Sequence, residues 1–270
     1  MATYVNVPTQ IPAELAEELH RLEPLFAVAR EFYALGVRLH PALDREERTS
    51  LQTVAYLIYG KAFRTFQSVL NLCLCGCGVD ALSLCGSLFE NLVDLKYMRK
   101  APVRRPLRYI QFEQVEKVYQ AEKILAHKRL PRGMRSRYRS YLAGLRAQAG
   151  ALTRHFPKRG LGWAQLTTKQ RAKSAGMEIE YEELYWIFCG YKHTLPAAAH
   201  GLMVDDEPQR DVAVGPNAGG VFEALVHALR YGLQVFASAS EAHGLNLEAE
   251  VDRIGRAFMT ACDAVGPARH

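Results

Sequence analysis

The sequence lacks the short motifs that identify most enzyme classes. It contains no Walker loop, no G-x-S-x-G nucleophile elbow, no H-E-x-x-H zinc motif and no glycine-rich dinucleotide turn. Its six cysteines include no C-x2-C pair, because Cys73, Cys75 and Cys77 alternate with other residues. Two sulfur ligands normally reach one zinc ion from a C-x2-C spacing. We therefore expect cysteines that act as small hydrophobic residues, and we predict neither a metal nor a cofactor.

The sequence also shows no segment that would direct the chain to a membrane. Residues 1–24 have no basic region followed by an apolar one, so no signal peptide is predicted. Residues 69–89 are about as long as a bilayer span, but polar residues such as Asn71 and Asp80 interrupt them. We interpret this stretch as buried helix, and we expect a cytoplasmic protein with no membrane partner.

Alternation of polar and apolar residues is absent, whereas apolar residues recur at spacings of three and four along nearly the whole chain. This pattern predicts helices, at residues 13–22, 24–39, 46–74, 78–99, 104–128, 132–152, 180–203, 218–243 and 247–264. The apolar fraction, 49%, is enough for one large core. We predict an all-α fold, a single multi-helix bundle domain, with N-terminal helices in 1–45 and a helical core in 46–264.

Acidic residues are missing from one long segment, 123–173. Of the 34 Lys and Arg residues 14 lie there with no Asp or Glu, so that 20 basic residues face 28 acidic ones elsewhere. Guanidinium groups bind phosphate through paired hydrogen bonds, and aromatic rings stack on unpaired bases. The segment therefore predicts binding of RNA or another nucleic acid. The alternative is a solvated helix face that pairs with the acidic remainder of the chain or with a partner protein.

The candidate nucleic-acid-binding residues are cations and a tyrosine of this segment. They are Arg132, Arg135, Arg137, Arg139, Tyr138, Lys158 and Arg159. Three further aromatic residues, Tyr141, Phe156 and Trp163, are interleaved with these cations, and we expect them to stack on bases too.

The stretch Gly190–Gly201, GYKHTLPAAAHG, holds three candidate catalytic residues. In a straight helix His193 and His200 would lie roughly 10 Å apart along the axis, which is too far for both to bind one metal. An imidazole can transfer protons near neutral pH, and Lys192 with His193 can hold a phosphate. These groups suffice for RNA cleavage without a metal. The alternative is that both histidines are hydrogen-bonded helix residues.

Two carboxylates, Glu90 and Asp94, lie four residues apart on one side of an otherwise apolar helix. A carboxylate in a core needs a partner, and histidine or lysine is the natural one. We therefore name Glu90 as a fourth candidate catalytic residue, which would orient His193 or His200. A helix cap is the alternative role.

Residues 77–97, CGVDALSLCGSLFENLVDLKY, precede a proline-containing turn and Arg108-Tyr109. This run resembles a signature of the helical bacterial family called domain of unknown function 5677. Residues 181–201, a tyrosine-rich helix that ends in histidine and glycine, are similar to a second signature of that family. The resemblance spans about residues 50–240. Gly86 stands where the family usually has arginine, and Pro196 where it tends to have serine.

That family is similar in turn to the HEPN superfamily (higher eukaryote and prokaryote nucleotide-binding domains), whose ribonucleases are helical and usually dimeric. The resemblance implies a HEPN-like fold in which Lys192 replaces an arginine, His193 a polar residue and His200 a histidine at the dimer seam. Seven residues separate Lys192 from His200, a longer spacer than is usual.

The function implied by the resemblance is that of a homodimeric, metal-independent endoribonuclease that serves as a toxin or antiphage defence effector. The alternative is a non-catalytic helical module, a sensor or scaffold, that binds nucleic acid or a partner protein. The departures at Gly86, Lys192 and Pro196 favour this alternative.

Overall fold

The computed structural model describes residues 13–44, 46–193, 203–206, 209–212 and 215–266. Within these residues the chain is all-α except for one short pair of strands, as the apolar spacing predicts. The helices are α1 (Ala13–Arg21), α2 (Glu23–Leu43), α3 (Ser50–Leu74), α4 (Gly78–Arg99), α5 (Arg104–Ala126), α6 (Arg132–Ala149), α7 (Thr168–Ala175), α8 (Glu178–Glu180), α9 (Trp186–His193), α11 (Val221–Ala242) and α12 (Glu248–Val265). A π-helical turn, Tyr181–Tyr185, joins α8 to α9. Strands β1 (Met203–Asp206) and β2 (Gln209–Val212) pair antiparallel.

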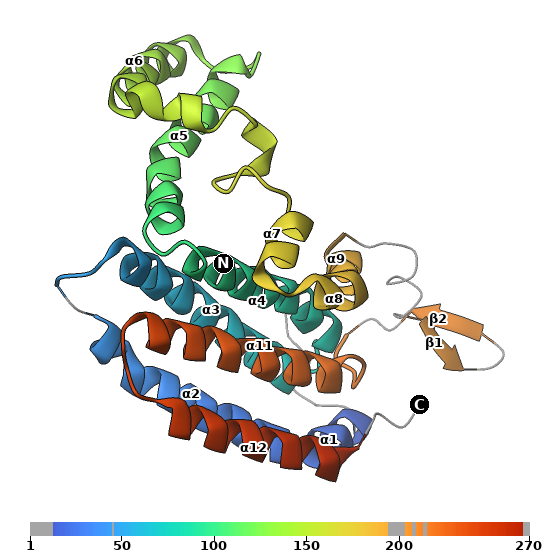
Figure 1. Ribbon diagram of the computed structural model, residues 1–270. Helices are drawn as coiled ribbons and strands as arrows, with labels where there is room; N and C mark the ends of the chain where they lie inside the picture. The colour runs from blue at the N-terminus through green and yellow to red at the C-terminus, as the bar shows by residue number, and fades with distance from the viewer. Residues whose placement is uncertain (1–12, 45, 194–202, 207–208, 213–214, 267–270) are drawn as a thin grey trace, which may run out of the picture.

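Three helices form the centre of the bundle (Figure 1). α4 packs against α3 and α11, and α3 and α11 also pack against each other. α2 and α12 lie side by side in a second layer, while α7 and α9 pack on α4 from the other side. α5 and α6 leave the bundle together as a projecting helical hairpin.

The main core joins the N-terminal helices to the rest of the bundle. The ring of Phe32 on α2 meets Phe66 of α3 edge to face at 4.9 Å and Phe236 of α11 at 5.7 Å. All three rings are buried, and edge-to-face contacts add to the free energy of their burial. The segments 1–45 and 46–264 therefore share one core wherever the structure describes them.

Two helices begin at recognisable local signals, and α3 begins at Ser50 rather than at the predicted residue 46. The hydroxyl of Thr49 accepts a hydrogen bond from the N–H of Gln52 at 3.3 Å, and the Gln52 side chain accepts one from the N–H of Thr49 at 2.9 Å. This capping box stabilises the first turn of α3. Pro24 lies in the first turn of α2, where its missing N–H leaves no hydrogen bond broken, so α1 and α2 divide there.

Residues 69–89 are not one helix. α3 ends at Leu74 and α4 begins at Gly78, and between them Gly76 takes a φ of +70° that suits glycine. No helix in the described part of the chain is long and apolar enough to cross a bilayer. All six cysteines are free. Cys73 and Cys85, on either side of this turn, are buried as expected of small hydrophobic residues, whereas Cys75 is exposed and does not fit that interpretation.

Candidate functional site

The α5–α6 hairpin has a small hydrophobic core of its own. Five apolar side chains from the two helices form it: Val118, Ala121, Leu142, Leu145 and Ala149. At the base of the hairpin the Tyr119 hydroxyl donates to the carbonyl of Phe156 at 2.8 Å. The two helices are therefore held to each other apart from the main core.

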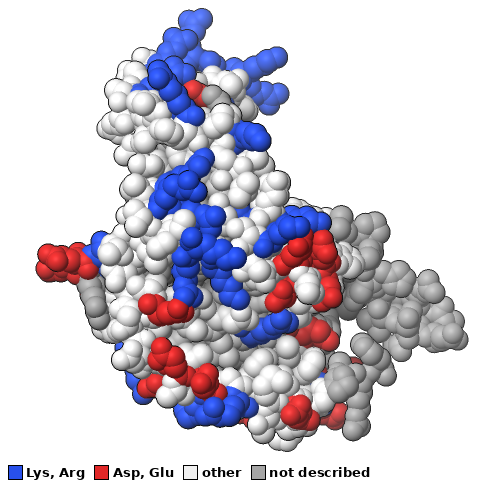
Figure 2. Space-filling view, in the orientation of Figure 1, with Lys and Arg blue, Asp and Glu red and all other residues white. Residues whose placement is uncertain are grey.

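Four arginines form a stripe along α6. At 100° per residue, Arg132, Arg135, Arg139 and Arg146 project within about 60° of one another. At 1.5 Å per residue the stripe is about 21 Å long. Arg137 leaves the helix about 140° from Arg132, on another side. Figure 2 shows Lys and Arg atoms crowded at the end of the hairpin that lies away from the bundle.

Two members of the stripe have partners within the hairpin. The guanidinium of Arg135 donates to the carbonyls of Leu125 and His127 at 3.1 and 3.2 Å. These bonds satisfy carbonyls at the C-terminal end of α5, which would otherwise lack donors. Arg146 pairs with Glu122 at 2.9 Å. Both arginines therefore help to hold α6 on α5.

The other predicted contacts on α6 face solvent. Arg132, Arg139 and Arg137 are exposed, and the structure records no carboxylate partner for them among the residues it describes. Tyr138 is half-buried, and its ring lies 6.4 Å from that of Tyr141, which is 53% exposed. Of these free guanidinium groups, that of Arg137 lies on the side of α6 that carries the exposed ring of Tyr141, whereas Arg132 and Arg139 lie on the opposite side.

The segment that follows the hairpin offers fewer exposed residues for binding nucleic acid than the sequence suggests. The Lys158 side chain is exposed, while its N–H and C=O bond the Gln165 side chain at 2.7 and 3.0 Å. The side chain of Arg159 lies outside the described residues. Phe156 and Trp163 are 0% and 8% exposed, so the prediction that they stack on bases is wrong. They are core residues, because each is covered by the root of the hairpin.

The last cations of the basic segment are neutralised by acidic neighbours. The ion pairs are Lys169–Glu182 at 2.8 Å, Arg171–Asp94 at 2.8 Å and Lys173–Glu178 at 3.2 Å. At this end of segment 123–173 the alternative interpretation holds, because the helix face pairs with the acidic remainder of the chain.

Asp94 is the centre of a half-buried polar cluster at the root of the hairpin. The Nε of Arg171 lies 2.8 Å from the Asp94 carboxylate without the alignment of a hydrogen bond, so their attraction is mainly electrostatic. Burial raises the pKa of Asp94 to about 6, although Arg171 and the indole of Trp163 oppose the rise. The partner is thus an arginine rather than the lysine or histidine that we expected.

Glu90 accepts a hydrogen bond from the hydroxyl of Tyr185. Burial and this hydrogen bond raise the pKa of Tyr185. The Tyr185 ring stacks on Tyr181 at 5.0 Å, so both rings of the π-helical turn lie on one side. Sequence reasoning missed this tyrosine as a partner of Glu90, although the tyrosine-rich run was visible.

The remaining candidate catalytic residues are only partly described. Lys192 and His193 end α9 and are exposed, and α9 packs on α4, which carries Glu90. His200 lies outside the described residues. No group of three or more His, Cys, Asp or Glu side chains gathers at metal-binding distance in the part of the chain that is described.

Gly86 brings α9 close to α4. A Cβ at this position would lie 3.1 Å from the Cβ of Phe188 on α9. Phe188 is itself buried, at 1% exposure, and cannot move aside into solvent. A long side chain at Gly86 therefore has no room while α9 keeps its place.

His227 on α11 is a half-buried titratable residue that the sequence did not signal. Its ring lies edge to face with Phe188 at 5.1 Å and stacks on Tyr231 at 6.0 Å. Burial, together with the smaller effect of the charge of Arg230, lowers the pKa of His227 to about 4. The imidazole is therefore neutral at neutral pH.

The helices of the hairpin, and α4 and α9 with their candidate residues, lie in a segment that matches a protein family. Residues 52–210 match the family model described as a family of unknown function, DUF5677. No curated protein and no solved structure matches the chain. The matched residues include all of α3 but its first two residues and continue through α9, and with them the hairpin, Glu90 and Lys192. Because the match covers more than half of the 270 residues, the chain belongs to the DUF5677 family.

Proposed function

We propose that this protein binds RNA through the arginine stripe of α6. The observation that carries the proposal is the exposure of Arg132 and Arg139, without a carboxylate partner among the described residues, on a projecting hairpin. Guanidinium groups in this state can each hold a phosphate through two hydrogen bonds. The exposed ring of Tyr141 is available for stacking on an unpaired base.

The charge pattern of α6 also favours a bound anion. Its first turn contains no acidic residue, and Arg132 and Arg135 lie close to the positive end of the helix dipole. Cations at that end are unfavourable in the free protein. A phosphate group bound there would interact favourably with the helix end and with the arginines at the same time.

The test is a salt titration of binding to a short, labelled single-stranded RNA. Each phosphate contact contributes about 0.7 to the slope of log affinity against log salt concentration for a single strand. The double variant Arg132→Ala/Arg139→Ala is expected to bind more weakly and to lower that slope by about 1.4. Wild-type slope and affinity in this variant would refute the stripe as the interface.

A matched control removes two cations elsewhere. Arg38 on α2 and Arg256 on α12 are exposed and lie in the layer away from the hairpin. The variant Arg38→Ala/Arg256→Ala has the same net charge as the stripe variant. It should keep most of the affinity, because a specific interface, unlike a general charge effect, depends on where the cations lie.

We propose as a second function that the protein cleaves RNA without a metal, as a HEPN-like homodimer. The exposure of Lys192 and His193 beside the helix that carries Glu90 favours it. In this proposal His200 is the general acid or base, His193 assists it, Lys192 holds the phosphate and Glu90 is a positioning group. Such an enzyme would act in the cytoplasm as a toxin or antiphage defence effector.

Cleavage is tested by incubating mixed RNAs with the protein in EDTA beside a His200→Ala variant. Products from the wild type that are absent with the variant would support the nuclease. Equal products from both proteins, or none from either, would reject it. RNA binding that persists in His200→Ala but falls in the stripe variant would then identify a non-catalytic RNA-binding module.

A further inference from the structure

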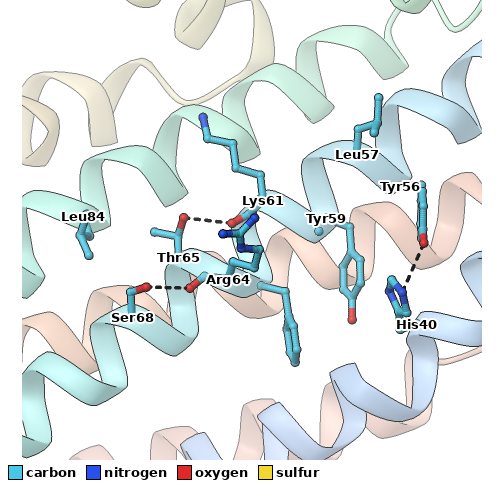
Figure 3. Close-up of a pocket in the computed structure, with 11 residues that line it drawn as sticks. His40, Tyr56, Leu57, Tyr59, Lys61, Arg64, Thr65, Ser68 and Leu84 are labelled. Carbon is cyan, nitrogen blue, oxygen red and sulfur yellow. Dashed lines mark hydrogen bonds between the residues drawn. The ribbon is translucent and has the colours of Figure 1, made fainter.

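A groove with a volume of about 660 Å³ runs along the exposed side of α3. α3 supplies most of its lining, while His40 of α2 and Leu84 of α4 close its two ends (Figure 3). Lys61 and Arg64 lie midway along the groove, between the hydroxyls of Thr65 and Ser68 and the aromatic side chains near His40. The groove lies apart from the α6 stripe, on the bundle itself.

The centre of the groove is a hole left by Gly60. In a helix, residue 60 is flanked by residues three and four away, which here are Tyr56, Leu57, Phe63 and Arg64. All four side chains line the groove. A Cβ at Gly60 would meet no atom within 4 Å, so packing within the protein does not fill this hole.

The rim of the hole favours an anion. The lining contains the cations Lys61 and Arg64 and no Asp or Glu. Both cations are exposed, and no ion pair is recorded for either among the described residues. Lys61 lies near enough to Asp94 to favour its ionised form, but that carboxylate already faces Arg171.

The walls of the hole favour an apolar ring. Tyr59 is buried, with its hydroxyl bonded to the carbonyl of Gly36 at 2.7 Å, and its ring stacks on Phe63 at 5.7 Å. Tyr56 is held by His40, whose Nε2 lies 3.3 Å from the Tyr56 hydroxyl. These rings are therefore fixed before any ligand arrives, which lowers the entropic cost of binding.

We propose that this groove binds an aromatic phosphate monoester, with its flat ring in the hole at Gly60 and its phosphate between Lys61 and Arg64. The volume lies in the range of small-molecule sites. The hydroxyls of Thr65 and Ser68 donate to carbonyls of their own helix at 3.0 Å each, and their oxygens can still accept. They therefore favour a ligand that retains a phosphate O–H at this end.

The test uses 1-naphthyl phosphate, whose fluorescence anisotropy reports binding directly. We expect saturable binding of this probe and weaker binding of inorganic phosphate, which lacks the ring, and of 1-naphthol, which lacks the phosphate. Arg64→Ala should weaken binding about tenfold or more, since it removes a charge-assisted hydrogen bond. Absence of saturable binding, or equal binding of 1-naphthol, would overturn the proposal.

A substitution that fills the space at Gly60 gives a more specific test. Gly60→Leu places a side chain where the ring would lie, and we expect it to abolish binding without unfolding the protein, because leucine suits a helix better than glycine. Gly60→Ala, which adds one methyl group, should reduce binding less. Unchanged affinity in Gly60→Leu would overturn the proposal even if the protein binds the probe elsewhere.

The source of such a phosphate monoester can be a free small molecule or the terminal nucleotide of an RNA strand that ends in a 5′-phosphate. Unchanged binding of 5′-phosphorylated RNA by Gly60→Leu would identify the free ligand, and weaker binding of that RNA would identify the strand end. The stripe variant Arg132→Ala/Arg139→Ala should bind 1-naphthyl phosphate like the wild type. The experiments can therefore refute the proposed phosphate site in the groove and the proposed RNA interface on α6 independently of each other.

Discussion

Single residues decide how closely the helices of this protein approach each other. Gly86 lets the Cβ of Phe188 come within 3.1 Å of the position that a side chain would take, and so places α9 on α4. The family to which the chain is similar usually has arginine at this position. The absence of a side chain here is thus a packing requirement of this particular chain.

Restoring arginine at this residue should therefore destabilise the protein. Gly86→Arg is expected to lower the free energy of unfolding by roughly 1–3 kcal/mol, the usual cost of overpacking a core. Gly86→Ala should cost less, because its methyl group needs only a small shift of Phe188 and alanine favours the helix. Urea unfolding of the three proteins measures the difference. An arginine variant as stable as the wild type would show that α9 can move away.

The sequence predicted the carboxylates on α4 but not the residues that pair with them. The spacing of Glu90 and Asp94 signalled two carboxylates on a buried helix side, but their partners, Tyr185 and Arg171, lie about 95 and 77 residues away in sequence. Nothing local in a sequence specifies such pairs. Phe156 was wrongly predicted to stack on bases for a related reason. Its place between cations in the sequence does not show whether the folded protein buries its side chain.

At the scale of elements, strong apolar periodicity predicted α3, α4, α5 and α11 to within a few residues. α7 was missed because only Ala172 of its eight residues is buried, so it has little apolar pattern. The capping box of Thr167 and Gln170 was its available signal. β1 and β2 were missed because four-residue strands rich in charge show no alternation.

The separate core of the α5–α6 hairpin predicts that it can unfold alone. Leu142→Ala removes a buried side chain from that core. The substitution should lower the free energy needed to open the hairpin by at most about 2–5 kcal/mol. Hydrogen exchange should quicken in α6 and the second half of α5 while α3, α4 and α11 keep their protection.

The comparison for that experiment is Leu88→Ala, which removes a fully buried side chain from the main core. It should lower protection throughout the bundle. If Leu142→Ala does the same, the hairpin and the bundle form one cooperative unit.

On the scale of the whole molecule, two half-buried groups give opposite dependences of stability on pH. The pKa of Asp94 is raised from 3.8 to about 6, so the folded state holds its proton longer and stability falls as pH rises through this window. The pKa of His227 is lowered from 6.5 to about 4, so the unfolded state binds the proton more readily and stability rises with pH over this window. The two effects largely cancel between pH 4 and 6.

Replacing His227 should reveal the pH dependence of stability that is due to Asp94. In His227→Phe, the free energy of unfolding is expected to fall by about 2–3 kcal/mol as pH rises from about 4 to 6.5, because the Asp94 effect is no longer opposed. Wild-type protein should change much less over the same range. Urea unfolding at several pH values measures both. A His227→Phe profile parallel to that of the wild type would show that this histidine is not held neutral by the fold.

Because the hairpin has a core of its own, its length can change without a change in the packing of the bundle. Adding the same number of whole helical turns to α5 and α6 would move the arginine stripe outward by about 5.4 Å per turn and leave the bundle untouched. The distance from the stripe to the root at Asp94 would thus change while every contact in the main core is kept. The length of the hairpin therefore sets how far from the bundle the arginine stripe lies, independently of the packing of the bundle.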